Sequence, residues 1–285
     1  KPGQRILIHS HIYNALRNLM RFIAELRGAT IEVIDLPLST EASEVVEQRI
    51  SERLGDDVGL VVIDHITSPT AVTFPIERIV AACRSAQVPV LIDGAHGPGH
   101  RPLELTQLNA DWYVGNGHKW LGAPRGTAFI WAHENWLNRT EPPVISHGYQ
   151  SDFSENFMRH GTIDFSAWST LTATLDWYGR LDRHGAFTHA SAMLKDGYQK
   201  TVEALGATPI TDPDGQSMMA AMLLPKPWTA EQAEPLRRRL SQDFRIINVP
   251  IDLPTGELLL RLSAYGYTQA SDFDRLIGAF KEIAA

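Results

Sequence analysis

Apolar and polar residues follow two different periods along the first half of the chain. Short apolar runs bounded by turn residues predict strands, and stretches whose apolar positions recur every three or four residues predict amphipathic helices. Strands are expected at Arg5–Ile8, Thr30–Ile34, Leu60–Ile63, Val88–Ile92, Trp112–Gly115 and Ala128–Ala132, and helices at Tyr13–Arg27, Ser43–Leu54 and Ile76–Ser85. This alternation predicts an α/β fold, with a mainly parallel central sheet and helices on both faces.

The pattern changes in the second half of the chain. Residues 141–164, rich in Pro, Gly, His and Ser, predict a long functional loop. The next elements form a mixed series, with strands at Met218–Leu224, Arg245–Pro250 and Leu258–Ser263 and helices at Ala230–Asp243 and Ser271–Ala284. We therefore expect a large domain over residues 1–165, a long connecting helical segment over 166–205, and a small α+β domain over 206–285.

Composition and charge narrow the classes of partner. The chain has 285 residues, of which 44% are apolar, and a formal net charge of -7 without a dense Lys/Arg tract, so we expect neither nucleic acid nor a membrane as a partner. Its apolar runs are far shorter than the roughly 20 residues that cross a bilayer, and no signal-peptide pattern opens the chain, so a cytoplasmic location is expected. The chain starts without Met and runs directly into a strand, which suggests that an amino-terminal segment is missing.

The single cysteine, Cys83, limits the chemistry further. One thiol excludes disulfides within the chain and zinc clusters built from several thiolates. Its neighbours, Ile79 to Ala82, are mostly apolar and continue a helical pattern, so we expect Cys83 to be buried packing.

Polar residues follow four of the predicted strands, at the position where ligands of open α/β sheets bind. They occupy residues 9–11, 64–70, 93–100 and 116–120. Asp93 and Lys119 stand at the ends of two successive strands, among small residues. Such a pair suits a planar cationic heterocycle that carries an aldehyde, because a carboxylate favours a protonated ring nitrogen and partial burial helps a lysine lose its proton.

Two segments around Asp93 and Lys119 resemble motifs of a known protein family. Residues 91–96 read LIDGAH, and residues 113–120 read YVGNGHKW, followed by APRG at 123–126. Together they resemble the class V aminotransferase family of fold type I pyridoxal 5'-phosphate (PLP) enzymes, and most closely its isopenicillin N epimerase-like branch. HIYNA at 11–15, GTID at 161–164 and RLS at 261–263 extend the resemblance over nearly the whole chain. It implies the fold type I PLP-dependent transferase-like fold, PLP as cofactor and a small amino-acid substrate.

The resemblance also implies roles for single residues. Lys119 would hold the cofactor as a Schiff base and then move the α-proton of the substrate. Asp93 would hold the proton of the pyridine nitrogen. His11 would stack on the ring, with helix capping as the alternative, and His96 would lie near the phenolic oxygen, with a purely structural role as the alternative.

Further residues would hold the phosphate and the substrate. Asn116 and His118 are the phosphate donors that the resemblance implies, and Thr162 would reach the phosphate from a neighbouring subunit, so a homodimer with shared active sites is expected. Ser68 stands where cysteine desulfurases carry an Asn that touches the cofactor's oxygen. Arg261 would clamp the α-carboxylate of the substrate, with an ordinary surface ion pair as the alternative.

The reaction itself stays open at this stage. Epimerisation at the α-carbon, transamination, and β-elimination or C–S cleavage all begin with loss of the α-proton. A persulfide-forming desulfurase is disfavoured, since Cys83 precedes Asp93 rather than lying in the small domain. Epimerisation, our first prediction, requires a second acid–base group, and none of His147, Tyr149 or His160 can be assigned to that role. The aromatic residues Trp120, Trp168 and Tyr149 could line the pocket or pack in the core.

Two functions of other classes compete with this prediction. His9, His11, His96 and His100 could form the metal site of a hydrolase, which would leave Asp93 and Lys119 without a role. The chain could also be a catalytically inactive binding protein on the same scaffold. No serine-hydrolase elbow, P-loop or dinucleotide fingerprint is found in the sequence.

Overall fold

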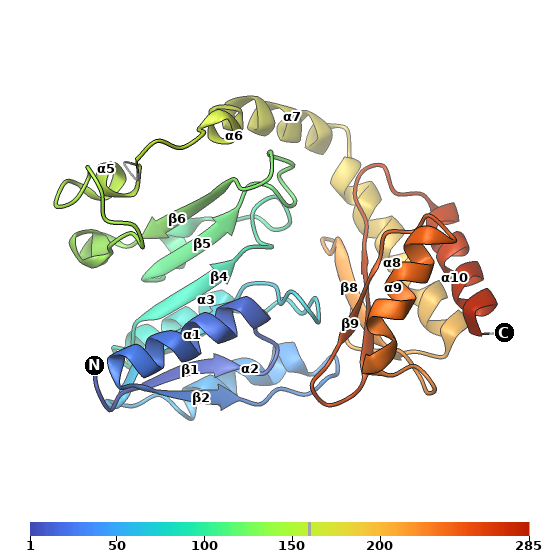
Figure 1. Ribbon diagram of the computed structural model, residues 1–285, viewed down its shortest axis with the longest axis horizontal. Helices are drawn as coiled ribbons and strands as arrows, with labels where there is room; N and C mark the ends of the chain where they lie inside the picture. The colour runs from blue at the N-terminus through green and yellow to red at the C-terminus, as the bar shows by residue number, and fades with distance from the viewer. Residues whose placement is uncertain (159–160, 285) are drawn as a thin grey trace.

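The computed structural model describes residues 1–158 and 161–284 and contains two separate sheets (Figure 1). The larger sheet has the strand order β2-β1-β3-β4-β5-β6. Its strands are β1 (Arg5–His9), β2 (Thr30–Ile34), β3 (Val58–Asp64), β4 (Val90–Gly94), β5 (Trp112–Asn116) and β6 (Ala128–Ala132). The first five are parallel and β6 is antiparallel to β5, so the mainly parallel sheet is as predicted.

Helices cover both faces of this sheet because successive side chains of a strand point to opposite sides. On one face α1 (Asn14–Arg27) packs on a cluster that includes Ile6, Ile8 and Val62. The other face holds α2 (Ala42–Ser51) and α3 (Ile76–Ser85). Their apolar sides join the alternate strand residues, such as Leu7, Val61 and Ile63, in the largest core of the sheet domain.

Two sequence predictions about the middle of the chain need correction. The loop expected over residues 141–164 contains a short helix, α5 (Phe153–Met158). The segment over 166–205 is helical as predicted, but it is divided into three helices, α6 (Ser166–Ser169), α7 (Leu171–Arg183) and α8 (Ala186–Leu205). Gly185 separates the last two with a φ of +72°, a conformation that glycine adopts without steric cost. In Figure 1, α7 runs along the top and leads to the small domain. A short helix, α4 (Leu105–Leu108), precedes β5, and a 3-10 helix, η1 (Glu134–Arg139), follows β6.

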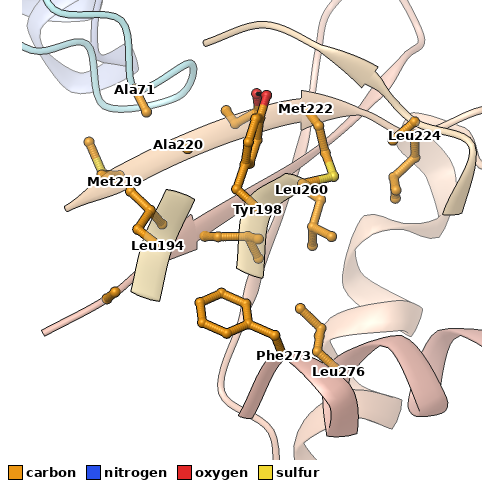
Figure 2. Packing of buried hydrophobic residues seen from close by; sticks show 14 of the residues in the cluster. Ala71, Leu194, Tyr198, Met219, Ala220, Met222, Leu224, Leu260, Phe273 and Leu276 are labelled. Atoms are coloured by element: carbon orange, nitrogen blue, oxygen red, sulfur yellow. Dashed lines mark hydrogen bonds between the residues drawn. The ribbon is translucent and has the colours of Figure 1, made fainter. Parts of the chain in front are cut away.

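The second sheet is antiparallel and has the order β7-β8-β10-β9. Its elements are β7 (Thr208–Pro209), β8 (Met219–Leu223), η2 (Ala230–Gln232), α9 (Ala233–Gln242), β9 (Val249–Asp252), β10 (Leu258–Ser263) and α10 (Ala270–Ala284). The helix predicted from Ala230 therefore begins as a 3-10 turn, and the strand predicted from Arg245 begins only at Val249. The helices α8 and α10 pack on this sheet around Tyr198, Leu260 and Phe273 (Figure 2).

Side chains connect the two domains close to the carboxyl ends of the large sheet. Arg101, which follows β4, pairs with Asp214 at 2.8 Å. The backbone N–H of Met218 donates to His100 Nε2 at 2.8 Å. These contacts hold the small domain against the strand ends where ligands of α/β sheets bind. Within the described chain, no helix combines the length and the apolar character needed to span a membrane.

Candidate active site

Lys119 lies in the loop that follows β5 and contacts the loop that follows β4. Its Nζ is 3.2 Å from His96 Nε2, and on the other side of the same ring His96 Nδ1 accepts the indole N–H of Trp120 at 3.1 Å. His96 and Trp120 are buried. The three side chains thus form a continuous chain of polar contacts at the ends of two adjacent parallel strands.

The environment of Lys119 lowers the pKa of its amine. Burial lowers the pKa of Lys119 below 10.5, and the Arg261 guanidinium acts in the same direction. The carboxylates of Asp93 and Asp64 oppose this fall in pKa, which places both acids within electrostatic reach of the amine. A lysine with a lowered pKa is a better nucleophile at neutral pH.

Asp93 is positioned by the register of the sheet. It pairs with Asp64 on β3 and with Val114 on β5, and its Oδ1 accepts the N–H of Ala95 at 3.0 Å. Burial raises its pKa to about 6, and the adjacent Asp64 carboxyl adds to this rise. The next residue, Gly94, leaves no room for a side chain, because a Cβ there would lie 1.9 Å from the Tyr113 ring. The tip of β4 therefore presents one carboxyl group beside small residues.

A second acid and a histidine are buried next to Asp93. His9 Nε2, at the end of β1, lies 2.8 Å from Asp64 Oδ2, and both side chains are buried. Burial raises the pKa of Asp64 well above 3.8 and lowers the pKa of His9 to about 3. The sequence analysis assigned no role to Asp64. Its position at the end of β3 matches the position of Asp93 near the end of β4, and this similarity could have indicated that Asp64 belongs to the site.

His11 is held between two segments and does not cap α1. Its Nδ1 is 3.0 Å from Thr70 Oγ1 and its Nε2 is 3.3 Å from the Leu36 carbonyl. The N-cap of α1 is Tyr13, and no side chain caps this helix end. Burial lowers the pKa of His11 to about 4, so the ring is neutral at pH 7. Because the His11 ring is neutral and held at both nitrogens, it is better suited to stack on a planar group than to act as an acid or a base.

The three predicted phosphate residues have different surroundings. His118 Nδ1 donates to the Thr127 carbonyl at 2.8 Å, so only its Nε2 remains available to a ligand. Asn116 is the last residue of β5 and is half-buried. Thr162 is exposed, in the loop that precedes α6. Asn116 and His118 therefore lie near Lys119, whereas Thr162 faces solvent in the isolated chain.

Arg261 extends from β10 of the small domain to the large domain. Its Nη1 donates to the Ser68 carbonyl and, at 3.2 Å, to Ser68 Oγ. Burial lowers the pKa of Arg261. The sequence predicts that Ser68 touches the cofactor, and the structure adds a contact with Arg261 that the sequence did not indicate. Among the described residues Arg261 has no ion-pair partner, whereas the alternative prediction was a surface ion pair.

A cavity of about 400 Å³ brings Lys119 and Arg261 together. Its lining, which sequence reasoning foresaw only in part, consists of His96, Lys119, Trp120, Met219, Arg261, Ser263, Ala264, Tyr265, Tyr267 and Thr268. Tyr265 also donates its hydroxyl to the Trp120 carbonyl at 3.0 Å. The two tyrosines follow Arg261 closely in sequence, which could have indicated them. A larger cavity, of about 550 Å³, is lined by Arg101 and Asp214, which already pair with each other.

Other candidates lie away from the Lys119 cavity. Tyr149 and His147 are exposed, and Trp168 donates its indole N–H to the Ala128 carbonyl at 3.4 Å. His160 lies outside the described residues. The cavity is not lined by the other five predicted site residues that the structure describes near the strand ends, Asp93, His11, Asn116, His118 and Ser68. The site therefore has two parts, the cavity itself and the polar residues at the strand ends next to it.

The histidines of the alternative metal site have separate partners. His9 contacts Asp64, His11 contacts Thr70, His96 contacts Lys119, and His100 accepts the N–H of Met218. Over residues 1–158 and 161–284, no group of three or more His, Cys, Asp or Glu side chains has a geometry that could hold a metal ion. This arrangement gives no support to a metal-dependent hydrolase.

Comparison with known proteins identifies relatives over almost the whole chain. The family model described as "Aminotransferase class-V" matches residues 1–223. Isopenicillin N epimerase of Amycolatopsis lactamdurans is 30% identical over 302 residues, covering 99% of this chain and 74% of that protein. A protein named putative L-cysteine desulfhydrase 1 of Oryza sativa subsp. japonica is 26% identical over 315 residues, covering 99% of this chain and 65% of that protein.

A solved structure supports the fold independently. It is a C-DES mutant with glycine covalently linked to its PLP cofactor, with a TM-score of 0.80 and 20% sequence identity. The match covers 97% of this chain and 74% of that chain. These matches confirm the resemblance and the fold class predicted from the sequence.

Proposed function

Because the chain belongs to the class-V aminotransferase family, we propose that it is a PLP-dependent enzyme acting at the α-carbon of an amino acid or a small molecule that contains one. The observation that carries this proposal is the shared cavity of Lys119 and Arg261, an amine with a lowered pKa beside a guanidinium. PLP, when bound, supplies an electron sink for the charge that develops at the α-carbon.

The residues present fit this cofactor. A cationic pyridine nitrogen needs a carboxylate that water does not screen, and Asp93 is a largely buried acid at a strand end. An aldehyde needs a neutral amine, and burial favours that form of Lys119. His11 offers a neutral ring, and Asn116 and His118 offer polar groups beside Lys119 for the phosphate.

Each side chain then has a defined task. Lys119 Nζ would hold the cofactor and, once the substrate amine has replaced it there, would accept the proton that leaves the substrate α-carbon. Arg261 binds the α-carboxylate, because its planar group can meet both oxygens at once. Its anchoring to Ser68 keeps the guanidinium oriented before substrate arrives, which lowers the entropic cost of binding. His96 Nε2, which lies 3.2 Å from Lys119 Nζ, would be the donor to the phenolic oxygen of the cofactor.

Epimerisation at the α-carbon is the reaction we propose first, on the similarity to isopenicillin N epimerase across 99% of the chain. C–S cleavage is the second candidate, because the similarity to the desulfhydrase-named protein also covers 99% of the chain. A persulfide relay is disfavoured by the only cysteine. Cys83 is buried in α3, and burial raises the pKa of its thiol to about 12, so it does not supply a nucleophilic thiolate.

We also infer a homodimer in which Thr162 completes the phosphate site of the partner subunit. Thr162 is exposed and is followed by the residues Ile163, Phe165 and Trp168, which are 39%, 46% and 38% exposed. Apolar side chains gathered on one exposed segment are typical of a protein interface. Sedimentation of the full chain tests whether it is a dimer. Titration of the Thr162→Ala variant with PLP tests whether Thr162 contributes to cofactor binding. A monomer would contradict the dimer, and unchanged cofactor affinity in a dimeric variant would contradict the role of Thr162.

Borohydride reduction of the PLP-loaded protein, followed by peptide mass mapping, tests the cofactor site. A pyridoxyl group on the peptide that contains Lys119 is expected, and Lys195→Ala serves as a control that keeps this adduct. Modification of another lysine would overturn the assignment. An amino-acid panel assayed for loss of optical purity, keto acid and pyruvate then separates the reactions. Racemisation supports the first candidate, and pyruvate from cysteine supports the second.

A further inference from the structure

His96 has a different neighbour at each ring nitrogen. The Trp120 indole Nε1 lies 3.1 Å from Nδ1, and Lys119 Nζ lies 3.2 Å from Nε2. The three residues are close in space because the loops after β4 and β5 are adjacent at one edge of the sheet. Trp120 is held in place by the ring of His100, at 4.6 Å between centroids, and by the Tyr265 hydroxyl bound to its carbonyl.

The chemistry of these groups determines where the hydrogens lie. An indole N–H can only donate, so His96 Nδ1 must accept. Burial lowers the pKa of His96 well below 6.5, and the Arg261 guanidinium acts in the same direction, so the ring is neutral. A neutral imidazole carries one hydrogen, which must therefore be on Nε2. Nε2–H then donates to Lys119 Nζ, and only a neutral amine has a lone pair to accept it.

We propose that Trp120 is a positioning residue that fixes the Nε2–H tautomer of His96 and thereby keeps Lys119 in its neutral amine form. If Lys119 were an ammonium group, both ring nitrogens would face donors, and a neutral ring has only one acceptor. The inference extends the proposed function, since the neutral amine is the form of lysine that attacks an aldehyde. The cofactor role of Lys119 and the tautomer of His96 are nevertheless measured separately below.

Other charged groups act on Lys119 from the surrounding elements. Asp93 on β4 and Asp64 on β3 favour the ammonium form, while Arg261 on β10 disfavours it. Burial is the largest influence and also favours the neutral amine. His100 lies near His96 and is itself uncharged at pH 7, because burial lowers its pKa to about 3. The two carboxyl groups raise the pKa of Lys119 and so oppose its neutral form. The Nε2–H tautomer of His96 acts against them, because it donates to the neutral amine.

The first test measures the protonation of Lys119 in the full chain freed of cofactor. Fluorodinitrobenzene labels neutral amines, so the pH profile of Lys119 labelling, followed by peptide mass, gives its pKa. Trp120→Phe keeps an aromatic ring beside His100 and removes the N–H donor, which lets His96 accept from an ammonium group. The pKa of Lys119 should rise by about one unit, so labelling below this pKa should slow about tenfold.

A matched variant controls for the loss of an indole. Trp112→Phe removes an N–H that donates to Thr140 Oγ1 at 2.8 Å, at the opposite end of β5. It should leave the Lys119 profile unchanged. An unshifted profile in folded Trp120→Phe, confirmed by circular dichroism, would overturn the proposal.

The second test needs no folded variant of Trp120. Long-range ¹H–¹⁵N spectra of the wild-type chain with ¹⁵N-histidine, assigned with His96→Gln, report which ring nitrogen of His96 carries hydrogen. We expect a protonated Nε2 and an unprotonated Nδ1, and the reverse result would overturn the inference. Failure of the proposed function gives a different result, because PLP would then leave Lys119 unmodified while the tautomer and the labelling profile stay as expected.

Discussion

The ends of the large sheet and the core of the small domain are both buried, but they are buried with different residues. The strand ends contain His9, Asp64 and His65, which are at most 5% exposed. The small domain buries side chains such as Leu260 and Phe273 (Figure 2). Burying a titratable group costs free energy unless it is paired, whereas burying an apolar group is favourable. We infer that the strand ends serve chemistry and the small-domain core serves stability.

The largest expected effect tests the chemical side of this comparison. Lys119→Ala removes the amine from the cavity without removing an apolar contact of the core. Turnover should fall by about a thousandfold or more, and the pyridoxyl adduct should disappear, because the same amine binds the cofactor and moves the proton. Steady-state kinetics, peptide mapping and urea unfolding check this. A large loss of stability in this variant would blur the proposed division between the regions.

A core substitution should do the reverse. Leu260→Ala empties a fully buried position between β8 and β9, so the free energy of unfolding should fall by about 2–5 kcal/mol. The folded fraction should still form the adduct on Lys119. Leu19→Ala is the matched control, because Leu19 is 49% exposed on α1 and its loss should change stability by less than about 0.5 kcal/mol. Equal effects of the two variants would contradict the assignment of the core.

Arg261 belongs to both regions, since it starts in the small-domain sheet and ends at the cavity. Arg261→Lys keeps the charge but loses the planar group, so KM should rise about 10- to 100-fold while kcat changes less. Arg275→Lys is the control, as Arg275 contacts only the Phe244 carbonyl on the surface of the small domain among its described hydrogen bonds. An unchanged KM for Arg261→Lys would remove Arg261 from substrate binding.

The two regions should also differ in how pH changes stability, and this dependence comes from the strand ends. Burial lowers the pKa of His9 to about 3 and of His65 to about 4, against 6.5 in the unfolded chain. Between these values the unfolded chain binds more protons than the folded one, so stability is lost as pH falls below about 6.5. Each such histidine contributes at most about 1.4 kcal/mol per pH unit. Urea unfolding at pH 7 and pH 5 measures the loss.

Asp93 acts with the opposite sign, which offers a control. Its pKa is raised from 3.8 to about 6, so between these values the folded state binds a proton that the unfolded state does not. This uptake stabilises the folded state as pH falls and offsets part of the loss from the histidines. Asp93→Asn should therefore steepen the loss of stability between pH 6 and 4. A shallower profile in this variant would contradict the buried, protonated state of Asp93 at low pH.

How far the sequence predicts this protein depends on the kind of feature. Periodicity located the six strands of the large sheet, because the pattern of apolar and polar residues along a strand reflects which of its side chains are buried. It failed at Gly185, where the apolar pattern continues across a break between two helices. It also failed in the loop before α6, since the six residues of α5 are too few to show a period.

Local patterns and short motifs were enough to predict the α/β class and the positions of Asp93 and Lys119 at successive strand ends. The contacts that these side chains make become visible only in the folded chain. Arg261 binds Ser68 across 193 positions of sequence, and His96 joins Trp120 to Lys119 through two loops that meet in space. Such contacts depend on strand order and on how the two domains pack, and no local pattern encodes the distance between residues far apart in the chain.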